Sequence, residues 1–489
     1  MTCDIAGNLR TTTDGKGNPT TFTYNDDGSN QYAFPTKIQN ALSQSTSFGY
    51  DYNIGQATSS TDLNQNVTNY FYNDPLDRPT QVRSAVGTQY ENWTTYSYSG
   101  SGTTPAWQET QQDQTTKGDQ ALRTQQYFDG LGRPYRSDVY EGSSQYIETT
   151  QTYDAAGRIS QTTNPSRQNP ADNLGFATAY GYDLLGRRIT VTTPDTQAAA
   201  TSYSGNKKTV TDQANLQRAF VTDALGRLTD VYEDPQGNNN FHTNYVFDAL
   251  GNLLTVNQGT QTRNFTYDPL SRLTSATNPE SGKVSYTYDM AGNLLSITDA
   301  NQKVTCYGDI SGTDCTGSSN DPLNRPTIIT YSDGTPSVTF TYDSVTNGVG
   351  QLASVSNSNS TTNFTAFDNL GRVTASTQVT NGQTYRFSYT YNLAGALLTE
   401  TYPSQRTITI TPDSANRPNT LAGTLAGQTK RVIVASELNR YAVQSCPRRL
   451  REGRIRLARS GRTGKEQKGG GCKFPRLEER LLAVTAIQN

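Results

Sequence analysis

The stretch Val284–Thr298 reads VSYTYDMAGNLLSIT and contains the pattern that decides the fold. Before its aspartate, apolar and polar residues alternate, which is typical of a strand with one apolar face. After its glycine, Leu294–Thr298 predicts a second strand. Between the two, the Asp289 carboxylate can accept hydrogen bonds from N–H groups two or three residues on, and Gly292 suits a positive φ. The stretch therefore predicts a β-hairpin with a tight turn.

The same pattern recurs about fourteen times, and neighbouring aspartates are commonly 20–25 residues apart. The unit is an aromatic residue, aspartate, two further residues, glycine, and then arginine or asparagine. In the clearest copies the aspartate and glycine are Asp129 and Gly132, Asp154 and Gly157, Asp183 and Gly186, Asp248 and Gly251, Asp289 and Gly292, and Asp368 and Gly371. We predict that these twelve residues form structural turns.

The copies that lack the glycine support a backbone requirement. Asp77, Asn324, Asn416 and Ser271 stand in its place. Three of these four are Asn or Asp, the types other than glycine that best tolerate the left-handed region. The position three residues after the aspartate therefore requires a residue that can adopt a positive φ, and it does not require a particular side-chain functional group.

The repeated hairpins predict the fold class. A lone hairpin is marginal in water, so neighbouring hairpins must stack to bury their aromatic faces and pair their edges. We expect an all-β repeat protein, in which about fourteen stacked β-hairpins form one long, coiled antiparallel sheet over residues 1–442. The sequence leaves open whether this sheet closes into a shell or stays an open superhelix.

Composition and charge exclude several other classes. Only 33 % of the 489 residues are hydrophobic, which argues against one large apolar core. The net charge of −2 gives the repeat region no general reason to bind nucleic acid. No run of about 18 apolar residues predicts a membrane span, and residues 1–30 contain no signal-peptide pattern.

Few residues are candidates for chemistry. His242 is the single histidine, so a histidine-dependent triad or a multi-histidine metal site is hard to build. We expect His242 to be a solvated loop residue between hairpins. Each repeated aspartate is followed by an apolar pair and not by alternating oxygen ligands, so turn capping explains it better than calcium binding. We therefore predict no catalytic residue, no metal and no cofactor.

Two further features leave alternatives open. Cys306 and Cys315 can close a disulfide loop if the protein is exported; two unpaired thiols are the alternative. An arginine follows the glycine in many copies, and this row can form a ladder across adjacent hairpins by pairing with the aspartates or stacking on tyrosine rings. A stripe that contacts glycans is the alternative. The arginines are Arg133, Arg158, Arg187, Arg227 and Arg372.

These motifs resemble the YD repeats of the RHS family, which includes bacterial RHS and wall-associated proteins, the C-component shells of insecticidal Tc toxins, and teneurins. The resemblance covers about residues 1–420. It implies a spiralling β-sheet that encloses a C-terminal cargo, usually a toxin, or a cell-surface adhesion scaffold; carbohydrate binding is also associated with the family. The family's self-cleavage motif has its nearest match at 234–238, which ends in asparagine and lies mid-chain, so no autoprotease activity is transferred.

From this resemblance we expect a non-enzymatic scaffold, part of a larger shell that encapsulates or presents a toxin in bacterial competition or secretion. The rival hypothesis is a cell-surface adhesin whose sheet binds carbohydrate. The expected partners are the remainder of the shell or a toxin cargo, and glycans under the rival hypothesis. We expect a secreted or cell-surface location, with the export segment missing together with the N-terminus.

Residues 443–489 differ from the repeat region. Residues 444–489 hold twelve Lys or Arg and four Asp or Glu, and they contain no hairpin motif. We expect a disordered tail with a short helix near 477–487. Three interpretations stay open: unrelated sequence after a frame change, a basic extension that binds anionic surfaces or nucleic acid, or a short variable cargo held by an acidic shell.

Overall fold

The computed structural model describes residues 1–434 except 26–27, 29–30, 101, 103–104, 168–175, 236–240, 313 and 426–427. Within these residues the chain forms forty strands and no helix. In this part of the chain there is accordingly no helix that could cross a membrane. The predicted tail, 443–489, and its predicted helix lie outside the described residues.

The first strands are β1 (Thr2–Cys3), β2 (Leu9–Thr13), β3 (Pro19–Thr23), β4 (Lys37–Gln39), β5 (Ser45–Asp51), β6 (Gln56–Thr61), β7 (Val67–Phe71), β8 (Gln81–Ser84), β9 (Asn92–Tyr98), β10 (Ala106–Gln112), β11 (Leu122–Phe128), β12 (Pro134–Tyr140), β13 (Tyr146–Tyr153) and β14 (Ile159–Thr163). Next come β15 (Ser166–Arg167), β16 (Ala177–Tyr182), β17 (Arg188–Thr192), β18 (Ala198–Ser204), β19 (Lys207–Thr211), β20 (Gln217–Thr222), β21 (Leu228–Glu233), β22 (Phe241–Phe247), β23 (Leu253–Gln258), β24 (Gln261–Tyr267), β25 (Leu273–Asn278), β26 (Gly282–Tyr288) and β27 (Leu294–Thr298).

The remaining strands are β28 (Val304–Cys306), β29 (Gly308–Ser311), β30 (Asp314–Ser318), β31 (Ile328–Tyr331), β32 (Val338–Tyr342), β33 (Leu352–Ser356), β34 (Ser360–Phe367), β35 (Val373–Thr380), β36 (Gln383–Tyr391), β37 (Leu397–Thr401), β38 (Thr407–Pro412), β39 (Pro418–Leu425) and β40 (Gln428–Val434). Almost every strand pairs antiparallel with its neighbours in sequence. Two steps skip strands: β14 pairs with β16 and so passes over β15, and β28 pairs with β31 and so passes over β29 and β30. Thirty-eight strands form one sheet, and β29 and β30 form a separate hairpin.

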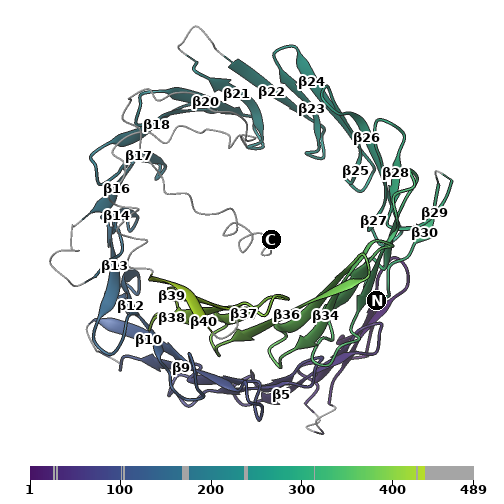
Figure 1. Ribbon diagram of the computed structural model, residues 1–489. Helices are drawn as coiled ribbons and strands as arrows, with labels where there is room; N and C mark the ends of the chain where they lie inside the picture. The colour runs from purple at the N-terminus through teal and green to yellow at the C-terminus, as the bar shows by residue number, and fades with distance from the viewer. Residues whose placement is uncertain are drawn as a thin grey trace, which may run out of the picture.

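The sheet is a ribbon that winds around the centre of the molecule (Figure 1). It makes one circuit from β1 to about β26 and then passes the N-terminal strands again, so that β34–β40 lie on the inner side of β5–β10 (Figure 1). We call residues 1–288 the first winding and 289–434 the second winding. The prediction of one all-β antiparallel sheet of stacked hairpins is confirmed, and the open question is answered: the sheet is an open spiral.

The strands turn back at two margins of the ribbon. The turns that start at the repeated aspartates share one margin, which we call the aspartate rim. The turns that connect one hairpin to the next share the opposite margin, which we call the linker rim; they include 14–18, 40–44, 62–66, 113–121, 141–145, 193–197, 212–216, 299–303 and 402–406. Most of the contacts described below lie on one of these two rims.

The ribbon contains little apolar core, as its composition predicts. The buried apolar side chains are few and scattered, and several are alanines, such as Ala219 and Ala276. Polar side chains are buried as well, and both Asp113 and Asp138 are fully covered. Strand β32 shows the expected alternation, with Val338, Phe340 and Tyr342 half-buried between exposed threonines. Contacts between neighbouring hairpins therefore have to supply the stability that a central core gives a globular domain.

Candidate functional site

Each aspartate-rim turn is closed by its own aspartate. In the turn at Asp129, the backbone N–H of Asp129 donates to the Arg133 carbonyl at 2.9 Å, and Gly132 N–H donates to the Asp129 carbonyl at 2.9 Å. The Asp129 carboxylate accepts from the N–H groups of Leu131 at 2.9 Å and Arg133 at 3.0 Å. The donors thus lie two and four residues on. The expected donor three residues on was wrong, because that N–H is used in closing the backbone turn.

The residue three positions after the aspartate has a positive φ in ten turns of the rim. The glycines have φ values of 75° (Gly132), 80° (Gly157), 79° (Gly186), 88° (Gly251), 87° (Gly292) and 74° (Gly371). At the four positions without glycine, φ is 55° (Asp77), 61° (Ser271), 62° (Asn324) and 62° (Asn416). The backbone conformation is therefore the same whichever side chain occupies the position. For an L-residue other than Asn or Asp this conformation costs about 1–2 kcal/mol.

The arginine that follows the glycine joins its own turn to the next turn. The Arg158 Nε donates to the Asp154 carboxylate at 2.7 Å. Its Nη1 donates to the backbone carbonyl of Asp183, in the next turn, at 3.1 Å. Its guanidinium lies over the ring of Tyr182, 4.6 Å from the centroid. One side chain therefore holds three groups from two successive repeats.

The ion pair with the turn's own aspartate and the contact with the next aromatic ring recur along the rim, and we call this row the arginine ladder. It includes Arg78 over Tyr98 (4.0 Å), Arg133 over Tyr153 (4.2 Å), Arg187 over Tyr203 (4.0 Å), Arg227 over Phe247 (5.2 Å), Arg272 over Tyr288 (4.7 Å), Arg325 over Tyr342 (4.3 Å) and Arg372 over Tyr391 (4.9 Å). Each of these arginines also pairs with the aspartate of its own turn. Pairing with aspartate and stacking on tyrosine, which the sequence offered as alternatives, occur together.

The ladder also depresses the pKa of the rim carboxyls. The side-chain hydrogen bond from Arg133 is the largest cause at Asp129, and that from Arg158 is the largest at Asp154; each lowers the pKa below its usual value. At Asp74 the hydrogen bond from Arg78 lowers the pKa to about 2. These aspartates are therefore charged at neutral pH, as the ion pairs require.

The two windings meet along a line of polar contacts that we call the seam. There the aspartate rim of the second winding faces the linker rim of the first. Lys16 Nζ lies 2.9 Å from the Asp289 carboxylate, and Gln44 Nε2 donates to Asp343 at 3.0 Å. Further along, Gln114 Nε2 donates to the Asp413 carbonyl at 2.7 Å. Partners along the seam are roughly 300 residues apart in the chain.

The asparagines of the seam make its most regular contacts. Asn64 is bonded twice to Val349: its side-chain N–H donates to the carbonyl at 3.1 Å, and its side-chain oxygen accepts from the backbone N–H at 2.8 Å. Asn324 Nδ2 donates to the Asp14 carboxylate at 2.8 Å. Arg417 pairs with Glu141 at the far end. The sequence analysis did not find these linker-rim residues, because nothing local marks which rim will meet another.

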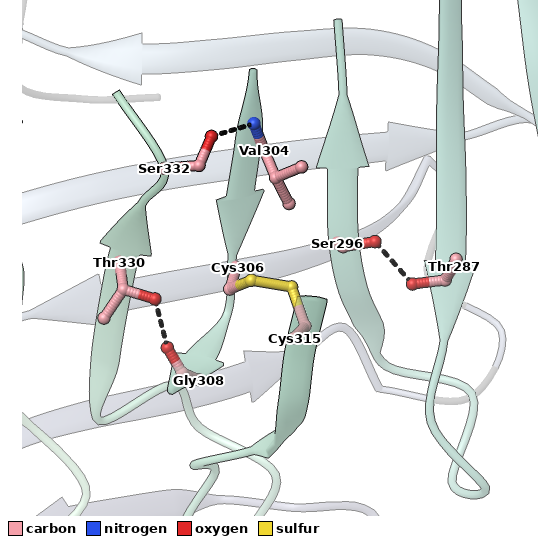
Figure 2. The surroundings of a disulfide bond; sticks show 8 residues. All are labelled: Thr287, Ser296, Val304, Cys306, Gly308, Cys315, Thr330 and Ser332. Carbon is pink, nitrogen blue, oxygen red and sulfur yellow. Dashed lines mark hydrogen bonds between the residues drawn. A yellow bond between two sulfur atoms is a disulfide. The ribbon is translucent and has the colours of Figure 1, made fainter. Parts of the chain in front are cut away.

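The two candidate cysteines are joined. Cys306, which is fully buried at the end of β28, forms a disulfide with Cys315 in β30 (Figure 2). The bond ties the small β29–β30 hairpin, which projects from the outer side of the ring (Figure 1), to the main sheet. The Thr330 hydroxyl donates to the Gly308 carbonyl at 2.6 Å and secures the start of that hairpin (Figure 2).

The single histidine is not in a loop. His242 lies in β22, stacked on Tyr232 with the ring centroids 4.4 Å apart, and its Nε2 lies 2.8 Å from the Asp230 carboxylate. The loop expectation was wrong because strand pairing extends to Phe241 opposite Glu233. In the described residues no group of three or more His, Cys, Asp or Glu side chains could hold a metal ion. Of the stretch 234–238, residues 236–238 lie outside those residues.

Two family models match parts of the chain. The RHS Repeat model matches residues 247–283 and 267–304, which contain the turns at Asp248, Asp268 and Asp289. A domain of unknown function, DUF6443, matches residues 101–180. No curated protein sequence matches the chain.

Several solved structures share the fold. The crystal structure of TcdB2-TccC3 aligns with a TM-score of 0.71 and 16 % identity, covering 87 % of this chain and 26 % of that one. The structure of TcdB2-TccC3 without its hypervariable C-terminal region gives 0.71 and 14 %, covering 87 % and 28 %. A Tc holotoxin pore of Photorhabdus luminescens with a substitution in TccC3 gives 0.69 and 14 %, covering 85 % and 27 %. The chain spans about a quarter of the length of these matches.

Replacing a turn glycine tests the backbone requirement. We expect Gly251→Val to destabilise the β22–β23 hairpin by at least about 1 kcal/mol, because φ there is 88°. Amide hydrogen exchange of β22 and β23 measures the change locally. Gly251→Asn should retain most of the stability, and Ala249→Val, at an exposed position of the same turn, serves as the control. Equal protection in Gly251→Val and Ala249→Val would contradict the requirement.

A double-mutant cycle tests the arginine ladder. Arg158→Lys keeps the positive charge, but an ammonium group cannot both pair with Asp154 and stack on the Tyr182 ring as the planar guanidinium does. We therefore expect an interaction free energy of about 0.5–1 kcal/mol between Arg158→Lys and Tyr182→Leu. Unfolding of the β16–β17 hairpin, followed by hydrogen exchange, provides the four free energies. The control is Arg218→Lys, since Arg218 is largely exposed and its ion pair with Glu233 spans 3.7 Å. Additive effects of the Arg158 and Tyr182 substitutions would refute the coupling.

The depressed rim carboxyls predict acid sensitivity. A carboxyl whose pKa is lower in the folded state than in the unfolded state stabilises the fold at any pH above its unfolded-state pKa, which is about 4. This contribution is lost as the pH falls through the pKa of the folded state. We therefore expect Tm to be steady from pH 7 to 5 and to fall between about pH 4 and 2. Asp154→Asn, which keeps an acceptor oxygen but cannot titrate there, should show a smaller decline. A Tm that does not change down to pH 2 would argue against the ion pairs.

Proposed function

Because this chain is an RHS-repeat protein, we propose that it forms one part of a shell that encloses and presents a C-terminal toxin or effector in bacterial competition or secretion. In this role it acts through its shape and not through catalysis. Its partners are the remainder of the shell and the cargo, since the match covers only 26 % of the other chain.

One observation carries the proposal: the ribbon winds past a full circuit and attaches to itself along the seam (Figure 1). A flat or loosely curved sheet would present two open faces and would hold nothing. A ribbon locked at the seam has a fixed inner face. The last described strand, β40, lies on the inner side of the ring (Figure 1).

The disulfide supports an exported location. Disulfides persist in oxidising compartments and are rare in reducing ones. The Cys306–Cys315 bond lies at the base of a hairpin on the outer side of the ring. Secretion or display at the cell surface is therefore part of the proposal.

The charge distribution along the chain supports a proposal for which segment the shell encloses. Residues 444–489 hold twelve Lys or Arg and four Asp or Glu, whereas the whole chain has a net charge of −2. The repeat region is therefore acidic, and a basic segment inside an acidic shell is favoured electrostatically. On this view the segment after β40 is held against the inner face.

The adhesin alternative is weaker on geometric grounds. Sugars bind aromatic side chains through an open ring face. One face of Tyr153, Tyr182, Tyr203 and other ladder rings is covered by a guanidinium at 4.0–4.6 Å. The most regular aromatic row of the sheet is thus already partnered. Binding of the full chain to a glycan array would restore this alternative.

Cross-linking tests enclosure. Neighbouring residues of a strand point to opposite faces, so Ala199→Cys and Ala200→Cys in β18 place one thiol on each face of the ribbon. Both variants carry Cys3→Ser, and the native Cys446 and Cys472 are the targets of a bifunctional maleimide. We expect one of the two variants to cross-link to Cys446 or Cys472 and the other not to. Equal cross-linking from both faces, or none from either, would overturn the proposal.

A further inference from the structure

The ribbon is narrow where β31 joins it, a region that we call the joint. Strand β31 shares two paired positions with β28 and two with β32. The neighbouring pairs are longer, since β27 and β28 share three positions and β32 and β33 share four. Because pairing between neighbours holds the ribbon together, contacts from outside the sheet contribute most to stability at such a short strand.

The β29–β30 hairpin lies against one face of the joint. It contacts β27, β28 and β31. Cys306 pairs with Ser296 on one side and with Thr330 on the other, so their side chains share a face of the sheet with that of Val304 (Figure 2). All four residues are at most 7 % exposed, in a sheet that buries few side chains elsewhere. The joint is therefore a small buried cluster that the hairpin helps to cover.

The disulfide attaches the far strand of this hairpin. Strand β30 pairs with β29 in a separate two-stranded sheet, and Cys315 in β30 is bonded to Cys306 in the main sheet. The near strand, β29, is attached by chain continuity and by the Thr330 hydroxyl, which donates to the Gly308 carbonyl at 2.6 Å. A two-stranded hairpin is marginal by itself. Breaking the disulfide therefore allows the hairpin to leave the joint.

The hairpin leads directly into the first contact of the seam. The Thr327 N–H donates to the Ser319 carbonyl at 3.0 Å and closes the turn that follows β30. At the tip of this turn, Asn324 Nδ2 donates to the Asp14 carboxylate of the first winding at 2.8 Å. Lys16, two residues further on, forms its ion pair with the second winding beside it. The position of the hairpin is thus linked to the place where the two windings first meet.

We propose that the Cys306–Cys315 disulfide is a redox latch. In oxidising surroundings it holds the β29–β30 hairpin on the joint and, through the following turn, the seam contact at Asp14. Reduction by a thiol, as in a reducing compartment, releases both. That this release also opens a shell rests on the proposed function, whereas the latch itself concerns only the two windings of this chain.

The two sulfur atoms differ in access, which fixes the order of the exchange. Cys306 is fully buried and Cys315 is partly exposed. A thiolate of the reductant attacks Cys315 Sγ, the S–S bond breaks, and Cys306 leaves as a thiolate that takes up a proton. A second reductant thiol attacks the mixed disulfide and releases Cys315 as a thiol. Two thiols become one disulfide, and their two electrons and two protons reduce the latch.

Hydrogen exchange and lysine acylation, with and without dithiothreitol in native buffer, test the latch. On reduction we expect exchange of peptides within 319–332 to become at least about tenfold faster, because the joint loses its cover. We expect acylation of Lys16, whose side chain is 20 % exposed in its ion pair, to become at least about twofold faster as the seam contact opens. Acylation of Lys283, which is exposed in β26, should not change.

Cysteine variants of the full chain isolate the effect. The parent for these measurements carries Cys3→Ser, Cys446→Ser and Cys472→Ser, so the latch holds its only sulfur pair. The matched control adds Cys306→Ala and Cys315→Ala. It should show the fast exchange and acylation without dithiothreitol and should not respond to it.

The rest of the seam shows whether the fold persists. The Val349 N–H donates to the Asn64 side chain at 2.8 Å, and the Leu393 N–H donates to the Gln114 carbonyl at 2.9 Å. Both should stay protected in every sample. Loss of their protection together with that of the joint would overturn the latch in favour of a bond that the whole ribbon needs.

Three other outcomes would also overturn the proposal. They are a disulfide that dithiothreitol does not reduce, unchanged exchange at the joint, and unchanged acylation of Lys16. None of these measurements involves a cargo, so their outcome is independent of the cross-linking test of enclosure.

Discussion

A guanidinium held between the carboxylate of its own turn and the aromatic ring of the next is the contact on which this structure depends. The sheet is a single layer with few buried apolar side chains, so it has no central core to stabilise distant hairpins together. Each hairpin alone is marginal. The arginine ladder links successive turns at centroid distances of 4.0–5.2 Å, and it does so in addition to backbone pairing. Stability in such a ribbon is a sum of neighbour contacts.

The seam is of a different kind, because it joins residues roughly 300 positions apart through side chains and single backbone groups and not through strand pairing. Hydrogen bonds of this type contribute modestly one by one, about 0.5–1.5 kcal/mol each, but they recur at every hairpin of the overlap. They fix the pitch of the spiral and join its two windings into one continuous surface. The proposed shell function rests on this contact between unlike rims.

Much of the aspartate rim could be predicted from the sequence, because each turn is specified by residues that are close together in the chain. An aspartate followed three residues later by glycine, asparagine or serine marks a positive φ in any context, and the structure has φ between 55° and 88° at the ten positions compared. Details that depend on neighbouring strands were less accessible. The second donor to each carboxylate is four residues on, and His242 lies in a strand because pairing with β21 extends further than its asparagine-rich surroundings indicate.

The sequence by itself determined the all-β class, the hairpin unit and the turns that carry the repeat motif, because all of these follow from period-two patterning and turn chemistry within about 25 residues. Only the tertiary structure decided that the ribbon overlaps itself as an open spiral, which rims meet, and that Lys16 faces Asp289 or Asn64 faces Val349. The reason is physical: curvature is the sum of small twists between many strands, and a small change in each step moves every seam partner. No local pattern records that sum.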